Sequence, residues 1–209
     1  MTEALTSSGR AASDAELIIV SKTFGVDDIR PLLLAGHRKF GENRVQESQS
    51  KWPGLREEFP DLELHLIGPL QSNKADEAVA LFDVIQTIDR PKIATAVAKA
   101  IKLTARKIRC LVQVNIGLEA QKAGIEPDQA DQFIRSCITE QGLNIIGVMC
   151  IPPVDEDPLP YFERLKDIAR RNTLKEVSMG MSGDYEPALQ HGATMVRVGS
   201  AIFGGRPKI

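Results

Sequence analysis

The chain has 209 residues, of which 43% are hydrophobic and 26% are charged, and its formal net charge is -2. This composition is ordinary for a soluble globular protein and argues against disorder. The nearly balanced charge gives no electrostatic reason to expect binding to nucleic acid or to an anionic membrane. No apolar run approaches the length that crosses a bilayer, so no membrane association is expected.

The first 14 residues are rich in Ser, Thr and Ala and lack the basic start and apolar block of a secretory signal. We predict a flexible segment over 1–14, followed by a single domain over 15–209, in a cytoplasmic protein. The three cysteines are odd in number, far apart and set among apolar neighbours: Cys110, Cys137 and Cys150. Buried free thiols in a reducing compartment explain them better than a disulfide or a metal site.

The first strong signal is the stretch 16–23, an apolar run rich in Ile and Val that ends abruptly at Lys22. Its shortness and composition are typical of a strand buried on both faces. Lys22 then lies at the carboxyl end of that strand, where ligands collect in parallel α/β proteins. Desolvation there would lower the pKa of the amine and allow it to form a Schiff base with an aldehyde such as pyridoxal phosphate. The alternative is that Lys22 only marks a strand leaving the core.

Further along the chain, strands and helices alternate without a Pro-, Gly- or Ser-rich linker. The predicted strands are 16–23, a brief one just before Asn43, 62–67, 82–88, 109–114, 144–150, 176–178 and 194–198. Helical spacing predicts helices over 27–35, from about 43, over 71–81, from 91, from 127, over 160–171 and up to 192. Eight such repeats predict a single (β/α)₈ TIM barrel, with an open doubly wound sheet as the alternative.

Asn43 has a simple structural explanation at this stage. Gln46 follows it three residues later, a spacing that resembles a capping box at the start of a helix. In a barrel, however, Asn43 would also share the carboxyl-end face with Lys22.

The glycine-rich segments follow the last two strands, where barrels often hold a phosphate on backbone N–H groups. Ser182 could add a hydroxyl group, and Gly199 and Ser200 could add backbone N–H groups, although such glycines also punctuate ordinary turns. Arg197 lies inside the apolar strand 194–198, so its charge needs a partner. That partner is either a ligand such as a pyridine nitrogen or a barrel carboxylate. The three histidines have no metal-ligand spacing, so no metal site is expected.

Several motifs resemble those of the pyridoxal phosphate homeostasis protein family, small proteins similar to the N-terminal barrel of alanine racemase. The matching segments run in register over almost the whole chain: 20–23, 40–47, 65–74, 113–115, 122–124, 147–149, 178–185 and 196–204. The segments 178–185 and 196–204 are the most specific.

The resemblance implies that pyridoxal phosphate forms a Schiff base with Lys22. It also implies that Asn43 and Met179 lie beside the cofactor ring, and that Arg197 faces the pyridine nitrogen. Ser182, with the backbone of Gly199 and Ser200, would hold the phosphate. The implied function is vitamin B6 homeostasis by a monomer without robust catalytic activity.

Two departures from the family pattern stand out. Only about 15 residues precede the first strand, where the family usually has a helix, so this cap is expected to be absent or frayed. Many members also carry a second lysine two residues after the first, where this chain has Phe24. Any role of that second lysine in cofactor transfer is therefore in doubt here.

Amino-acid racemization is the alternative function. An arginine at the pyridine nitrogen leaves that nitrogen unprotonated, which weakens the cofactor as an electron sink. Racemases with this arrangement add an acid/base group from another domain and subunit, for which this chain has no room. A third hypothesis is an interaction protein that signals cofactor occupancy, but the sequence predicts no large exposed apolar patch.

Overall fold

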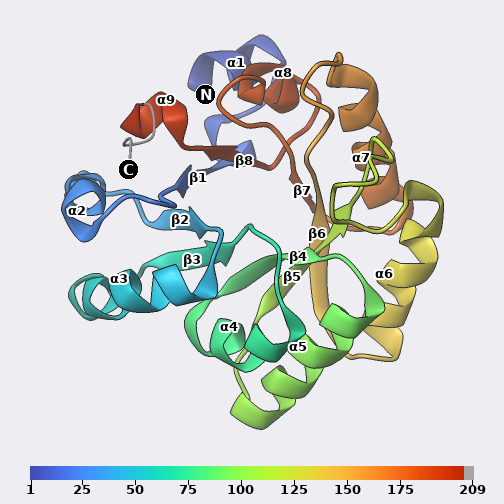
Figure 1. The fold of residues 1–209 in the computed structure, drawn as a ribbon. Helices are drawn as coiled ribbons and strands as arrows, with labels where there is room; N and C mark the ends of the chain where they lie inside the picture. The colour runs from blue at the N-terminus through green and yellow to red at the C-terminus, as the bar shows by residue number, and fades with distance from the viewer. Residues whose placement is uncertain (205–209) are drawn as a thin grey trace.

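The computed structural model describes residues 1–204, and their eight strands close into a parallel barrel surrounded by helices (Figure 1). The strands are β1 (Glu16–Val20), β2 (Lys39–Glu42), β3 (Glu63–Leu66), β4 (Val84–Ile88), β5 (Arg109–Val114), β6 (Asn144–Cys150), β7 (Glu176–Ser178) and β8 (Met195–Val198). The α-helices are α1 (Thr2–Ser7), α2 (Val26–Leu34), α3 (Val45–Glu58), α4 (Ala75–Leu81), α5 (Pro91–Thr104), α6 (Ala130–Thr139), α7 (Leu159–Arg171), α8 (Tyr185–Gln190) and α9 (Ser200–Phe203). Short 3₁₀ helices are η1 (Ala12–Asp14), η2 (Ser72–Lys74) and η3 (Pro127–Gln129).

Pairing of the first strand with the last closes the barrel. Strand β1 runs parallel to β2 on one side and to β8 on the other, with Ile18 opposite Arg197. Every strand of the described chain therefore has two neighbours, and the predicted TIM barrel is confirmed over an open doubly wound sheet. The last five residues of the predicted domain 15–209 lie outside the described residues.

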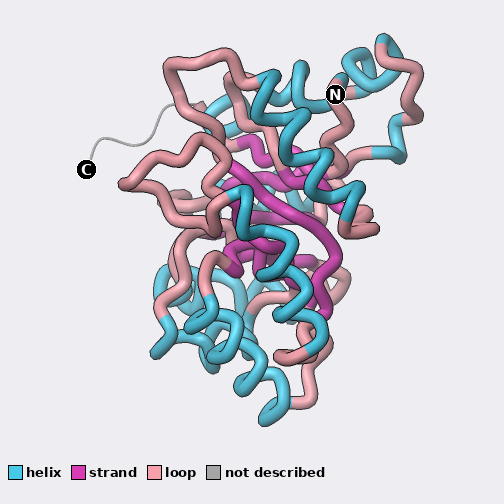
Figure 2. Tube along the Cα trace, turned by 90° about the vertical axis from the view of Figure 1, so that its right-hand side faces the viewer, coloured by secondary structure: helices cyan, strands magenta, loops and turns pink. Residues whose placement is uncertain are grey.

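Side chains alternate between the inside of the barrel and the layer under the helices, as the period of two along a strand requires. A small apolar cluster fills part of the interior: Ile18, Val84, Leu111, Met149 and Met195. The larger cluster lies between strands and helices and includes Phe40 and Trp52, whose ring centroids are 5.2 Å apart. Viewed at right angles to Figure 1, the strands lie inside a shell of helices (Figure 2).

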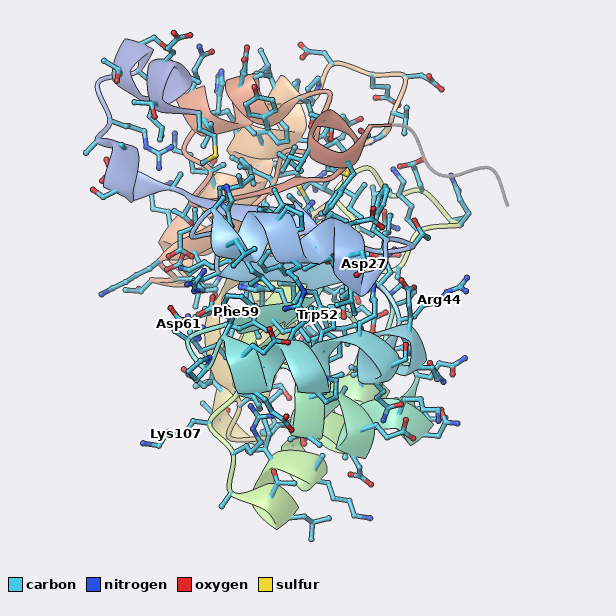
Figure 3. The ribbon with its side chains drawn as sticks, turned by 90° about the vertical axis from the view of Figure 1, so that its left-hand side faces the viewer. Asp27, Arg44, Trp52, Phe59, Asp61 and Lys107 are labelled. Atoms are coloured by element: carbon cyan, nitrogen blue, oxygen red, sulfur yellow. The ribbon has the colours of Figure 1, made fainter. Side chains whose placement is uncertain are left out.

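All eight strands point the same way, so their carboxyl ends share one face of the barrel. Figure 3 shows Arg44, which follows β2, and Asp61, which precedes β3, at opposite ends of the molecule. The face near Arg44 therefore receives the loops after the strands, where the predicted site residues lie.

The segment before β1 contains a helix that the sequence did not predict. Helix α1 buries Ala4 and Leu5, and the Arg10 guanidinium donates to the Leu189 carbonyl at 2.6 Å, which ties the segment to α8. A short helix therefore precedes the first strand, so the expectation that this cap would be absent is wrong. The predicted flexibility of residues 1–14 stays a prediction.

The three cysteines are buried, as expected, and none is paired with another. Burial raises the pKa of each thiol to about 12, so these side chains are packing groups at neutral pH. Within residues 1–204, the helices are too short or too polar to cross a membrane.

Candidate cofactor site at the carboxyl ends of the strands

One pocket of about 310 Å³ brings together six of the seven predicted site residues. They are Lys22, Asn43, Ser182, Arg197, Gly199 and Ser200. Lys22 follows β1, Asn43 follows β2, and the other four come from β8 and the loops after β7 and β8. Residues far apart in sequence therefore meet because the parallel strands end at one face.

Met179 is the predicted site residue that the structure does not bring to this pocket. Its side chain is fully buried in the cluster between strands and helices. Ser178 points into the barrel, so the next residue along the chain points outward. Met181, two residues further on, lines the pocket instead. Gly180, with a φ of 89°, turns the chain between the two methionines, and strand alternation beyond Ser178 therefore does not carry on to Met181.

Arg197 is held inside the barrel mouth by neutral partners. Its guanidinium donates to the Ser178 hydroxyl at 2.6 Å and to the Cys150 carbonyl at 2.8 Å, and only 4% of the residue is exposed. Within the described chain no carboxylate forms an ion pair with it, so the barrel salt bridge considered above is absent. Burial lowers the pKa of Arg197 from its ordinary value, yet arginine stays protonated in proteins. An unneutralised cation therefore borders the pocket.

At the other side of the pocket, backbone N–H groups converge on a hydroxyl oxygen. The N–H groups of Gly199 and Ala201 donate to the Ser182 Oγ at 3.3 and 3.4 Å. Gly199 lies so close to β1 that a Cβ atom would come within 3.0 Å of the Val20 carbonyl oxygen. A larger side chain there would push the loop out of place. These groups have the chemistry that holds a small anion such as a phosphate.

Asn43 does not cap the following helix, so the capping-box interpretation is wrong. Helix α3 begins at Val45, its N-cap is Arg44, and no side chain caps it. Gly68, at the end of β3, approaches Asn43 so closely that a Cβ atom would lie 2.3 Å from its carbonyl oxygen. A glycine is therefore needed at 68 to keep the Asn43 backbone at the pocket.

An ionic cluster that sequence reasoning missed lies behind the loop that carries Lys22. The Lys51 ammonium donates to Glu42 at 2.7 Å, to Glu47 at 2.9 Å, and to the carbonyls of Ser21 and Phe24 at 3.2 Å each. The carbonyl contacts bracket Lys22 on both sides. The missed signal was a lysine on the buried stripe of α3, where Ser48, Trp52 and Leu55 also lie.

The same cluster supports a strained residue next to Lys22. Thr23 has a φ of 69°, which is unusual for a β-branched residue. Its N–H donates to the Glu47 carboxylate at 2.6 Å. Burial raises the pKa of Glu42, and the hydrogen bonds from Lys51 and Ser21 oppose that effect. The Lys22 loop is thus fixed by buried charges rather than by regular structure.

Phe24 forms part of the pocket wall and stacks on Phe203 of α9, with ring centroids 4.3 Å apart. The position that carries a second lysine in many family members therefore joins the Lys22 loop to α9 by an apolar contact here.

Within residues 1–204, no cluster of three or more His, Cys, Asp or Glu side chains is arranged to hold a metal ion.

The closed parallel barrel carries a lysine after its first strand and an anion-binding pair of loops, with Ser182 and Gly199, after its last two strands. This arrangement defines a class of barrel proteins whose ligand pocket lies at the carboxyl ends of the strands.

The sequence model of the alanine racemase N-terminal domain matches residues 5–207. The pyridoxal phosphate homeostasis protein of Vibrio cholerae is 41% identical over 95% of this chain and 88% of that protein. That of Escherichia coli strain K12 is 36% identical over 99% and 92%.

The chain therefore belongs to the alanine racemase N-terminal domain family, and within it to the pyridoxal phosphate homeostasis proteins. Among solved structures, PipY of Synechococcus elongatus with pyridoxal phosphate bound has a TM-score of 0.83 and 32% identity over 97% of this chain and 99% of that chain. Alanine racemase of Clostridium difficile, at 14% identity and a TM-score of 0.73, covers 99% of this chain and 56% of its own and shares the fold. The family predicted from the sequence motifs is confirmed.

Proposed function

We propose that this chain binds pyridoxal 5'-phosphate as a Schiff base on Lys22 and serves in intracellular vitamin B6 homeostasis. The observation that carries the proposal is the pocket itself, because one space is bordered by an amine, a buried cation and an anion cradle. These three chemistries match the aldehyde, the ring and the phosphate of the cofactor. The PipY structure with pyridoxal phosphate bound and the names of the curated relatives support it.

Each group in the proposed site has a distinct task. The Nζ of Lys22 makes the covalent link, and Asn43 borders the ring. Arg197, which can only donate hydrogen bonds, faces the pyridine nitrogen. Ser182 with the backbone N–H groups of Gly199 and Ser200 holds the phosphate. Met181, rather than Met179, is the methionine that borders the cofactor in this proposal.

Bound pyridoxal phosphate supplies an electron sink, whose strength depends on protonation of its ring nitrogen. Arg197 offers that nitrogen a hydrogen bond but no transferable proton. Besides the Arg197 guanidinium, the residues that line the pocket include one acid/base side chain, the amine of Lys22, because no Tyr, His, Cys, Asp or Glu is among them. Racemization needs two acid/base groups on opposite faces of the substrate. The lining therefore favours a protein that holds the cofactor over an amino-acid racemase.

We further propose that the protein acts as a monomer in the cytoplasm.

The proposal of a carrier without robust activity is tested with protein loaded with pyridoxal phosphate and incubated with L-alanine or L-serine. We expect the D-enantiomer to form no faster than with an equal concentration of free cofactor, because the second acid/base group is missing from the pocket lining. Turnover of about 1 per second or faster would contradict the proposal and favour the racemase. Chiral chromatography at several protein concentrations measures the rate and also detects activity that depends on self-association.

A further inference from the structure

A continuous line of polar side chains crosses the interior of the barrel, starting at Arg197. The Arg197 Nη1 group donates to the Ser178 Oγ at 2.6 Å. The Ser178 hydroxyl in turn donates to the Gln86 Oε1 at 2.6 Å. The three residues come from β8, β7 and β4, so only closure of the barrel places them in contact.

The line continues from Gln86 to the opposite end of the barrel. The Gln86 amide nitrogen lies 2.9 Å from the His65 Nδ1, and the His65 Nε2 lies 2.8 Å from the Glu63 Oε1. Arg109 donates to the other Glu63 oxygen, and the Lys39 ammonium is 4.0 Å from Glu63. These three charged groups, from β3, β5 and β2, are the ones that face His65 at that end.

The three middle members of the line have no access to water. Ser178, Gln86 and His65 are each 0% exposed. An unpartnered polar group at such a depth is destabilising, so each link is needed to satisfy the next residue. An apolar cluster of Ile18, Val84, Leu111, Met149 and Met195 lies in the same interior. A complete polar line beside it indicates a specific use.

The chemistry of the two ends fixes the direction of every hydrogen bond. Arg197 can only donate, so the Ser178 oxygen accepts and its own hydrogen is directed to the Gln86 oxygen. The Gln86 amide group then donates to the His65 Nδ1, and its nitrogen also lies 3.8 Å from the Met195 sulfur. A neutral histidine that accepts at Nδ1 carries its hydrogen on Nε2 and donates it to Glu63. Burial lowers the pKa of His65, which agrees with the neutral form.

We propose that Ser178, Gln86 and His65 are positioning residues, which hold the Arg197 guanidinium in one orientation through a one-way hydrogen-bond line anchored on Glu63. All donors point from the arginine toward the carboxylate, and hydrogen bonds arranged in this way strengthen one another. The Glu63 carboxylate, which anchors the line, lies at the amino end of β3, on the opposite side of the barrel from the pocket. Arg197 therefore has a fixed donor direction at the pocket, with neutral hydrogen-bond acceptors on its guanidinium.

The effect of the hydrogen-bond line on the protonation of the bound cofactor's ring nitrogen rests on the proposed function. A fixed arginine directed at the pyridine nitrogen would keep that nitrogen unprotonated. An ion pair between the guanidinium and a carboxylate would weaken its hydrogen bond to the pyridine nitrogen. The Ser178 hydroxyl holds the guanidinium in place without such an ion pair. The polar interior thus serves to hold the cofactor in its least reactive form.

The first test needs no cofactor and is carried out on the wild-type protein, with one variant used only to assign the signal. Nitrogen-15 NMR of the wild-type protein should show His65 as the neutral form protonated on Nε2 over about pH 5.5 to 8. The signal is assigned by its loss in His65→Asn. A hydrogen on Nδ1, or titration of His65 near its ordinary pKa, would overturn the proposed direction of the line.

The second test uses pyridoxal phosphate labelled with nitrogen-15 in its ring. Ser178→Ala should move the ring-nitrogen signal, make it pH-dependent and raise the Kd about 5- to 20-fold. Ser178→Thr, which keeps the hydroxyl, should restore the wild-type signal. Leu111→Ala, in the same interior but outside the line, should leave it unchanged. Signals and Kd equal to wild type in Ser178→Ala would overturn the proposal.

The two tests separate this inference from the proposed function. If wild-type protein takes up no pyridoxal phosphate, the proposed function fails, while the His65 hydrogen position still decides whether the line exists. If the cofactor binds and Ser178→Ala has no effect on its ring nitrogen, the proposed function survives and the positioning role fails.

Discussion

Lys51→Met should lower the free energy of unfolding by about 3 to 5 kcal/mol, because it leaves a buried carboxylate without its cation. Glu42 is 0% exposed and receives hydrogen bonds from Lys51, Ser21 and Trp52. Burial already raises the pKa of Glu42, and loss of the ammonium would raise it further. The variant also removes both carbonyl contacts that bracket Lys22, so the loop should loosen along with the core.

Urea denaturation followed by fluorescence measures this effect well, since the chain has 1 Trp and its indole N–H donates to Glu42 at 3.1 Å. Lys166→Met is the matched control, because Lys166 pairs with Glu163 on the surface of α7 with side chains about half exposed. That pair should contribute under about 1 kcal/mol. Equal stability of Lys51→Met and the control would contradict the role given to the buried cluster.

Pyridoxal without its phosphate should bind about 100- to 1,000-fold more weakly than pyridoxal phosphate, because it loses two or more charge-assisted hydrogen bonds. The N–H groups of Gly199 and Ala201 already converge on the Ser182 hydroxyl, within reach of an anion. The covalent link to Lys22 is available to both compounds. The comparison therefore isolates the contribution of the cradle.

Gly199→Val should abolish most of this preference, since a Cβ atom at 199 meets the Val20 carbonyl oxygen at 3.0 Å and displaces the loop. Gly54→Ala in α3, where a Cβ atom meets nothing within 4 Å, is the control and should keep the preference. Fluorescence titration with both compounds provides the Kd values. If wild-type protein binds the two compounds equally, the assignment of the phosphate to Ser182 and Gly199 is wrong.

The barrel could be predicted because its strands are short apolar runs with clear ends. Strands β5, β6 and β7 begin and end where the sequence predicts, at residues 109–114, 144–150 and 176–178. Local composition decides these boundaries, since a polar residue follows 114, a pair of prolines follows Ile151, and a glycine-rich segment follows 178. The eightfold alternation then leaves few ways to bury both faces of the sheet.

The errors came from features that depend on three-dimensional context. Asn43 has the spacing of a helix cap, but the tight approach of Gly68 holds its backbone at the pocket and α3 starts two residues later. By contrast, the predicted place of Met179 beside the cofactor ring stays a prediction, and the structure buries its side chain in the cluster between strands and helices. Helix α1 was missed because its packing against α8 outweighs a weak local preference.

The buried polar groups were the least predictable part of the site. The line from Arg197 to Glu63 has no local sequence signature, and the position of Lys51 on the buried stripe of α3 does not reveal its partners, because each group joins residues from several strands or helices. The sequence did indicate that Arg197 needed a partner in an apolar strand. It could not reveal that the partner would be Ser178, a neutral residue 19 positions away.

The central claim, covalent binding through Lys22, is tested most directly by an absorption spectrum of the purified protein with pyridoxal phosphate, taken before and after borohydride reduction. We expect a visible Schiff-base band that reduction converts into a permanent adduct at Lys22 and that Lys22→Ala lacks. Lys74→Ala, a lysine on the same face but outside the pocket, should keep it. An unchanged band in Lys22→Ala, or no band in wild-type protein with added cofactor, would contradict the assignment.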